Sequence, residues 1–157
     1  MQSRMQKFQL AEDAIHALLD TALHGRLSTL NADGYPYTVP VHFVFAEGRL
    51  YVHGLDRGQK IDNIRSYPLV GFEVDELDGL LTDNLSQPCQ ADAAYRSVVA
   101  QGDARLIDDP AEKHRVLGWF VRKYTPAFAP QDMPSNKVMA TCVIEITLRS
   151  LTGKYHA

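Results

Sequence analysis

The alternating run at residues 35–45 constrains the fold of this chain more than any other segment. Aromatic residues and valines occupy every second position from Tyr35 to Phe45, and the positions between them up to residue 42 are proline, threonine and histidine. Successive side chains of a β-strand point to opposite faces, so the run predicts a strand with one core face and one face of mixed character. Pro40 lacks a backbone donor, which predicts an edge, a bulge or a ligand-facing position.

Two turn signals flank this run. Residues 31–34 contain Asn and Gly, which tolerate positive φ, and residues 47–48 are Glu-Gly. The sequence therefore predicts a three-strand antiparallel meander over residues 25–30, 35–45 and 49–53.

The remaining segments predict a mostly β domain with peripheral helices. Residues 76–92 are acidic and turn-rich and are expected to form a long loop. Gly102 predicts a bulge or a close backbone approach within its strand. About six antiparallel strands need closure to remove exposed edges, which favours a small barrel with helices outside. The further predicted elements are helices at 11–22, 60–67 and 110–124, and strands at 69–74, 94–107 and 138–148. Asp109, Pro110 and Glu112 have the N-cap pattern of a helix start, and Cys142, Ile144 and Ile146 are expected to share one face of the last strand.

Length and composition predict one globular domain over residues 1–157, with residues 1–10 flexible. The chain is 45% hydrophobic and 22% charged, with a net charge of −3, so no general basic surface for nucleic acid is expected. No apolar stretch has the length of a signal peptide or a membrane span, which predicts a cytoplasmic protein without a membrane partner. The two cysteines are expected to be reduced.

A basic turn follows the third strand of the meander. His53, Arg57 and Lys60 surround Gly54 and Gly58 where a short helix is predicted to begin. Cations are unfavourable beside the positive end of a helix unless an anion such as phosphate neutralises them. Together with the mixed strand face, this turn suggests a flat ligand with an anionic tail. A solvated basic surface turn is the alternative.

Other reactive residues give weaker signals. His42 is a candidate substrate-facing group, although no carboxylate accompanies it at a telling spacing. Arg96 is expected to pair with the acidic stretch at 73–83 or to reach a ligand. The six histidines form no HxH or HxxxH pair and the cysteines form no CxxC pair, so no metal site is predicted.

These segments, taken together, resemble the pyridoxamine 5'-phosphate oxidase-like flavin-binding proteins, in particular the branch of the nitroimidazole-resistance proteins. The matching segments follow the order of that family over roughly residues 20–125. They are residues 25–30, the turn at 33–34, residues 35–41, residues 50–53 with Gly58 and Lys60, residues 72–75, residues 95–98, and Gly102.

The resemblance implies a Greek-key-like split β-barrel that forms a homodimer, with one FMN at each of two subunit interfaces. One strand would run along the isoalloxazine ring through Thr38, Val39, Pro40 and Val41. The basic turn would place three side chains by the ribityl phosphate, namely His53, Arg57 and Lys60. Arg96 and Ser97 would lie near the flavin or the dimer contact.

The resemblance also implies a function, an FMN-dependent oxidoreductase acting on a small molecule. Many relatives carry Ser where this chain has Gly54, so a hydroxyl donor to the phosphate is missing here. The C-terminus lacks the Arg-rich ending of pyridoxamine phosphate oxidase itself, which argues against that substrate. The alternatives are a non-catalytic flavin carrier or sensor, a haem- or deazaflavin-binding relative on the same barrel, and a ligand-free barrel that contacts partners.

Overall fold

The computed structural model describes residues 7–157, so predictions that concern residues 1–6 lie outside the described residues. Within the start that was expected to be flexible, Leu10 donates a backbone hydrogen bond to Gly153, 3.0 Å away. The elements are α2 (Glu12–Thr21), β1 (Gly25–Leu30), β2 (Pro36–Val41), β3 (Phe43–Ala46), β4 (Arg49–Gly54), α3 (Gln59–Ser66), β5 (Leu69–Leu81), η1 (Pro88–Gln90), β6 (Asp92–Ile107), α4 (Pro110–Tyr124), η2 (Pro126–Phe128), α5 (Ser135–Ala140) and β7 (Cys142–His156). Across the described part of the chain, no helix combines the length and apolarity that a membrane crossing needs.

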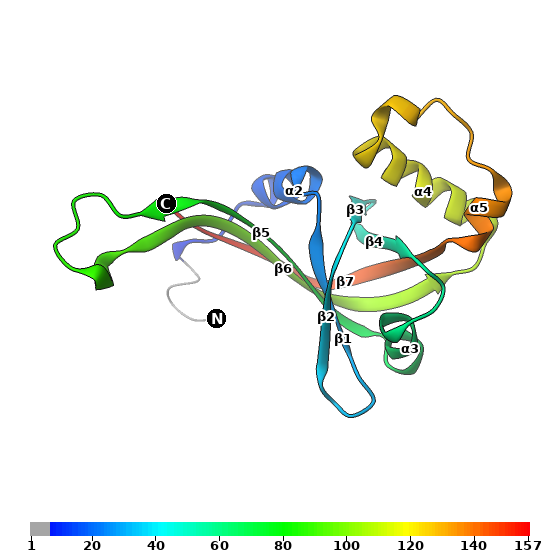
Figure 1. The fold of residues 1–157 in the computed structure, drawn as a ribbon, viewed down its shortest axis with the longest axis horizontal. Coiled ribbons are helices and arrows are strands. Elements are labelled where there is room, and N and C mark those ends of the chain that lie inside the picture. Colours follow the sequence, from blue (N-terminus) through cyan, green and yellow to red (C-terminus); the bar gives the residue numbers. More distant parts are fainter. Residues whose placement is uncertain (1–6) are drawn as a thin grey trace.

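One antiparallel sheet of seven strands curls into a split barrel in the order β2-β1-β5-β6-β7-β4-β3 (Figure 1). The two edge strands, β2 and β3, are neighbours in the sequence and are separated only by His42. A sheet whose opposite edges are joined by one residue must curve round to bring them together. The predicted mostly β fold with peripheral helices is confirmed, and Pro40 lies on an edge strand as expected.

The single strand predicted over residues 35–45 is wrong at its centre. The first half pairs with β1, from Leu30 opposite Pro36 to Gly25 opposite Val41, and the second half pairs with β4. The predicted meander is therefore divided into two hairpins. A period-two pattern continues through such a break because it reports which side chains are buried, not which strand lies alongside.

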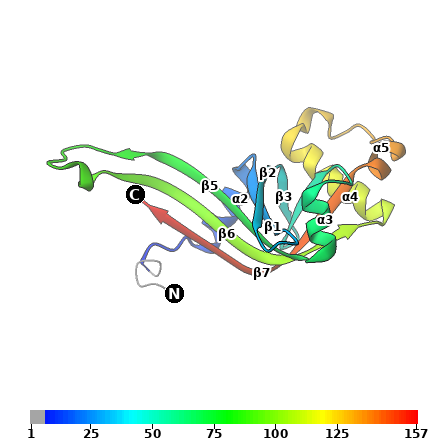
Figure 2. The ribbon, with the colours of Figure 1, turned by 60° about the horizontal axis from the view of Figure 1, so that its bottom comes forward.

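The strands bury side chains on both faces, which gives two apolar cores. Leu50 and Val52 of β4 lie in the larger core inside the barrel, which α2 closes with Leu18 and Leu19. Tyr51 points to the opposite face and lies in a smaller core beneath α4. Figure 2 shows the curved sheet with α4 and α5 at one end.

Helix α4 begins as the sequence predicts. The Asp109 carboxylate accepts a 2.8 Å hydrogen bond from the backbone N–H of Glu112, and Pro110 occupies the first turn. Helix α3 is held to β1 by Asn63, whose buried amide donates to the Thr29 hydroxyl and to the Asn31 side chain, each at 2.9 Å. This anchor holds the middle of α3 against the barrel.

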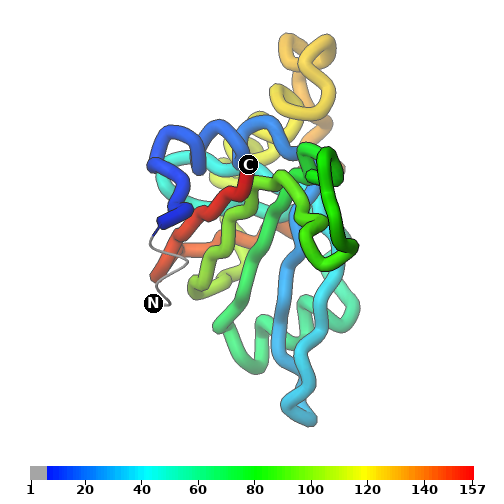
Figure 3. The backbone as a smooth tube through the Cα atoms, turned by 90° about the vertical axis from the view of Figure 1, so that its left-hand side faces the viewer, coloured from blue at the N-terminus to red at the C-terminus, as the bar shows by residue number. Residues whose placement is uncertain are grey.

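The predicted loop at residues 76–92 is shorter than expected. Strand β5 continues to Leu81 and β6 begins at Asp92, so the connection covers only residues 82–91. The two strands form an arm that projects from the barrel (Figure 1), and Figure 3 looks along this arm from the side of its tip. Leu77 and Leu80 of this arm are 62% and 71% exposed, respectively. Neither face of the arm contacts a core, which explains why no alternating pattern marked it as strand.

The start of the last strand also differs from the prediction. Val138 belongs to α5, where it packs into the smaller core, and β7 begins at Cys142. The prediction failed because β-branched and apolar residues of so short a helix continue the alternation of the strand that follows. The expected bulge is confirmed: the β6–β7 register shifts at Gly102, where an added Cβ would lie 2.5 Å from the Thr147 carbonyl oxygen.

Candidate functional site

A depression of about 400 Å³ lies where β2, β4 and α3 meet. Its lining contains no acidic residue and includes five residues that the sequence singled out together with one that it did not. The lining residues are His24, Pro40, Val41, His42, His53 and Lys60. The fold therefore brings the basic turn and the end of the mixed strand face into one site.

Lys60 is the cation of this depression. Its side chain is half-buried and lies over Gly54, because a Cβ on that glycine would be 3.6 Å from the Lys60 Nζ. Among residues 7–157, no carboxylate forms an ion pair with Lys60 and no group forms a hydrogen bond with its side chain. The first turn of α3 adds backbone N–H groups that have no intrahelical acceptor. Positive charge therefore gathers here without a protein counterion.

His53 lies at the end of β4 with its ring edge against Phe120, at a centroid distance of 4.4 Å. Burial lowers the pKa of His53 below its ordinary value of 6.5, and the nearby His42 and Lys60 lower it further. The imidazole is therefore neutral at pH 7. A neutral imidazole has one donor and one acceptor nitrogen, so it can donate to an anionic oxygen.

His42 occupies the break between β2 and β3. Its exposed ring stacks on Tyr124 of α4, with centroids 4.6 Å apart and planes 25° apart. The Tyr124 hydroxyl accepts from the backbone N–H of Phe43 at 2.9 Å and lies within hydrogen-bond distance of the Phe43 and Leu23 carbonyl oxygens. Helix α4 thus fixes the bend that presents His42.

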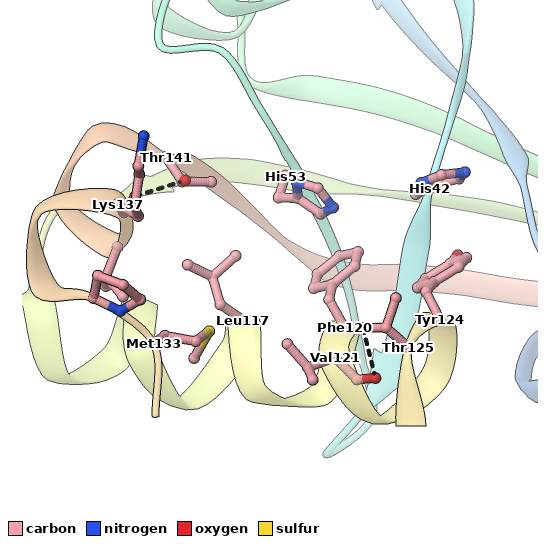
Figure 4. Close-up of a pocket in the computed structure, with 12 residues that line it drawn as sticks. His42, His53, Leu117, Phe120, Val121, Tyr124, Thr125, Met133, Lys137 and Thr141 are labelled. Carbon is pink, nitrogen blue, oxygen red and sulfur yellow. Dashed lines mark hydrogen bonds between the residues drawn. The ribbon is translucent and has the colours of Figure 1, made fainter. Parts of the chain in front are cut away.

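A second, apolar pocket of about 330 Å³ shares His42 and His53 with the depression. In Figure 4 the two histidines lie on one side of it, and Leu117, Phe120 and Val121 rise from α4 on the other. Met133, Pro134 and Val138 complete the apolar lining near α5. The sequence analysis did not find this pocket, because its lining residues have the same apolar pattern as the core stripe of α4.

Five of the residues predicted to lie near a ligand do not line the depression, and three of them belong to β2 and to the turn before α3. Arg57 is exposed in the turn before α3. The Thr38 hydroxyl forms a 2.8 Å hydrogen bond with that of Ser28, and Val39 packs against the larger core. Of residues 38–41, which were predicted to run along the ring, only Pro40 and Val41 line the depression within one chain.

Arg96 and Ser97 lie on β6, apart from the depression. The Arg96 guanidinium donates to Glu76 at 2.8 Å and to Asp78 at 3.3 Å, which confirms the expected pairing with the acidic stretch. Ser97 is buried opposite Asp75. Neither residue contacts the other candidates within this chain.

His24 is the lining residue that the sequence analysis missed. It directly precedes β1, and the pairing of Gly25 with Val41 places it opposite His42. The turn at residues 31–34 predicted the hairpin but not its register, because Leu30 pairs with Pro36 and not with Tyr35, so the sequence did not place His24 beside His42. No group of three or more histidine, cysteine, aspartate or glutamate residues in the described chain is arranged to hold a metal ion.

Comparison with known proteins gives matches over most of the chain. A reductase of 5a,11a-dehydrotetracycline and 5a,11a-dehydrooxytetracycline from Streptomyces rimosus is 31% identical over 96 residues, which cover 59% of this chain and 61% of that protein. The match thus spans less than two thirds of the length of that relative.

Two solved structures share the fold. A candidate 5-nitroimidazole antibiotic resistance protein from Bacteroides thetaiotaomicron gives a TM-score of 0.78 at 22% identity, over 94% of this chain and 86% of that one. The flavocytochrome Anf3 from Azotobacter vinelandii gives 0.86 at 23% identity, over 100% of this chain and 72% of that one. The sequence model of the family described as pyridoxamine 5'-phosphate oxidase matches residues 11–155. The chain therefore belongs to the pyridoxamine 5'-phosphate oxidase-like family, whose split barrel it shares.

Proposed function

We propose that this protein binds FMN in the depression between β2, β4 and α3 and acts as a flavin-dependent oxidoreductase on a small molecule. The observation that carries the proposal is Lys60, a half-buried cation with no counterion among the described residues, at the start of α3. A half-buried cation beside free N–H groups favours a bound anion, and helix N-termini are known binding sites for phosphate.

The residues of the depression fit the phosphate end of FMN. Lys60 and the first turn of α3 would hold the phosphate oxygens, and His53 would donate from its neutral imidazole. Arg57 is close in sequence and exposed, so it would contact the phosphate only after its side chain turns inward.

The flavin ring would lie along Pro40 and Val41, the residues of β2 that face the depression. Thr38, Val39, Arg96 and Ser97 do not reach this place within one chain, so their predicted contacts need a second subunit or a shift of β2. We expect a homodimer with FMN at the interface. Sedimentation equilibrium measures whether the protein is a dimer. The cytoplasmic location stays a prediction from the sequence, which cell fractionation tests.

Bound FMN would supply the electron chemistry, so the protein itself needs no nucleophile. The roles left to this chain are to hold the phosphate, to lie against the ring and to orient a substrate. His42 is an exposed polar residue that lines both the depression and the adjoining apolar pocket, and it is our candidate for contact with the substrate. The reductase activity of the Streptomyces relative supports an oxidoreductase, although that match covers only part of each protein.

A haem-binding function is the second candidate. The two histidines at the mouth of an apolar pocket favour it, and one structural relative is named a flavocytochrome. Haem would give a Soret band and a deazaflavin would give a shifted flavin spectrum.

A carrier or sensor would bind FMN without turnover. Reduction of the bound flavin by NADH or NADPH, and its reoxidation by an acceptor, therefore separates that role from catalysis.

The test is the visible spectrum of the purified protein, followed by titration with FMN. We expect a flavin spectrum, or saturable binding of one FMN per chain with an affinity in the micromolar range or tighter, about −8 kcal/mol or stronger. A colourless protein that does not bind FMN would remove the proposal. A Soret band would replace it with the haem candidate.

A further inference from the structure

We propose that the pocket between α4, α5 and the end of β4 binds an apolar, aromatic small molecule without positive charge, whose polar end lies at His42 and His53. Its role as the substrate pocket rests on the proposed flavin function. Ligand binding in the pocket does not depend on that function.

The size and lining of the pocket support a ligand site. Its volume of about 330 Å³ falls in the range of small-molecule pockets, which are mostly apolar with a few polar groups that fix orientation. Leu117 and Phe120 of α4 line the pocket and pack in the smaller core, and Val121 of the same helix is a half-buried part of the lining (Figure 4). A rigid helix therefore forms one whole wall.

Most polar atoms around the pocket already have partners within the protein. The Thr125 hydroxyl donates to the Val121 carbonyl at 3.3 Å, and the Thr141 hydroxyl donates to the Lys137 carbonyl at 2.8 Å. The Tyr124 hydroxyl is bound to backbone groups near β3. The polar groups left for a ligand are the two imidazoles and the exposed Lys137 ammonium.

The charges of these groups select the ligand. No residue that lines the pocket is acidic, so a cation would have no counterion there. Lys137 at one end favours an anionic or strongly accepting oxygen, and the neutral His53 accepts or donates one hydrogen bond. Lys137 lies toward α5, across the pocket from His42 (Figure 4), so the ligand that fits is an apolar molecule with a hydrogen-bonding group at the histidines and an anionic or accepting group toward Lys137.

The pocket adjoins the Lys60 depression, so ligands in the two cavities would be neighbours. Both are lined by His42 and His53, so a ligand in the apolar pocket would meet a ligand in the Lys60 depression at these two side chains. An oxidoreductase needs its substrate in contact with the reactive ring of its cofactor. The shared histidines are where such contact would occur.

The first experiment measures binding of the anionic dye 8-anilinonaphthalene-1-sulfonate by fluorescence. Val121→Trp should fill the centre of the pocket and raise the Kd of the dye about tenfold, which corresponds to about 1.4 kcal/mol. Met139→Trp adds the same indole to an exposed position of α5 outside the pocket and is the matched control, with an unchanged Kd expected. Equal Kd values for the two variants would overturn the proposal, because the dye would then bind elsewhere.

A second variant tests the charge selection without touching the core. Lys137→Glu should weaken binding of the anionic dye and strengthen binding of the cationic dye thioflavin T. Unchanged affinity for both dyes would refute the charge assignment. Lys60→Ala should leave the affinity for the anionic dye within about twofold while it weakens FMN. A protein that ignores FMN but binds the dye at the pocket refutes the proposed function alone, whereas FMN binding without dye binding at the pocket refutes this inference alone.

Discussion

Tyr51 and His53 lie two residues apart on the same face of β4, yet their surroundings differ completely. Tyr51 is fully buried beneath α4, and its hydroxyl donates to the Glu145 carboxylate at 3.3 Å. His53, one step along the same face, borders two cavities. The comparison separates polar groups that stabilise the fold from polar groups that are left open to a ligand.

At the Tyr51 end of this face, which we call the closed end, charged side chains form a complete network around Glu145. Glu145 is 3% exposed. Arg105 donates to Glu145 through Nε at 2.7 Å and to Glu112 of α4 at 2.6 Å. Burial by itself would raise the pKa of Glu145, but the hydrogen bond and charge of Arg105, with Arg49 and Tyr51, hold that pKa below its ordinary value. Every charge here has a partner, which ties β7, β6 and α4 together.

At the His53 end, which we call the open end, the charge lacks a partner within the described protein. Lys60 has no carboxylate partner among the described residues, and His53 is neutral because burial and neighbouring positive groups lower its pKa. A protein that needs charge only for stability pairs it, as at Glu145. Charge left unpaired in a depression is the pattern expected of a binding site.

The largest expected effect comes from removing the Glu145 carboxylate from the closed end. Glu145→Leu removes the acceptor of the buried Tyr51 hydroxyl and the partner of Arg105, so the free energy of unfolding should fall by about 2–4 kcal/mol. Urea denaturation at pH 7 measures it. Glu47→Leu removes an exposed partner of Arg115 and should change stability by less than about 1 kcal/mol.

The effect of Glu145→Leu on stability should depend on pH. Because the pKa of Glu145 is lowered on folding, its stabilisation is present above the ordinary value of 4.5 and is lost as the pH falls below 4.5 through the folded pKa. The stability difference between wild type and Glu145→Leu should therefore shrink below pH 4.5. A constant difference down to pH 3 would contradict the lowered pKa.

The next effect comes from removing the cation at the open end. Lys60→Ala should weaken FMN binding by about 1–3 kcal/mol, the value of one charge-assisted hydrogen bond, while the unfolding free energy stays nearly unchanged. Isothermal titration calorimetry gives the affinity, and Lys154→Ala on β7 is the matched control. Unchanged affinity for FMN would exclude Lys60 from the phosphate site.

A smaller gain is expected from restoring the missing hydroxyl. A Cβ at Gly54 would meet Lys60 at ordinary contact distance, so Gly54→Ser should fit without strain. The new donor should strengthen FMN binding by about 0.5–1.5 kcal/mol. If the affinity for FMN falls instead, the space above Gly54 is needed by the ligand itself.

The smallest expected effect concerns the titration of His53. Its ring resonances, assigned with His53→Gln, should titrate in NMR spectra with a midpoint below 6.5. Lys60 is one cause of the lowered pKa, so Lys60→Ala should move the midpoint upward, and Lys137→Ala should not. A midpoint at 6.5 in the wild type would mean that His53 is solvated and the depression is not formed.

The sequence by itself determined the local elements and the residues of the basic turn. The cap at Asp109, the hairpin turn at residues 31–34 and the face shared by Cys142, Ile144 and Ile146 all follow from short-range chemistry, and the structure confirms them. Resemblance added the barrel, and the family match confirms it.

Only the tertiary structure decided how these pieces meet. The break at His42, the length of the β5–β6 arm and the helix at Ser135–Ala140 depend on contacts between residues far apart in the sequence. The same holds for the site: His24 joins it through strand register, and Phe120 and Tyr124 through the packing of α4. Hydrophobic periodicity records only whether a side chain is buried, so the partner that buries it, or the cavity that is left beside it, is fixed when the sheet closes.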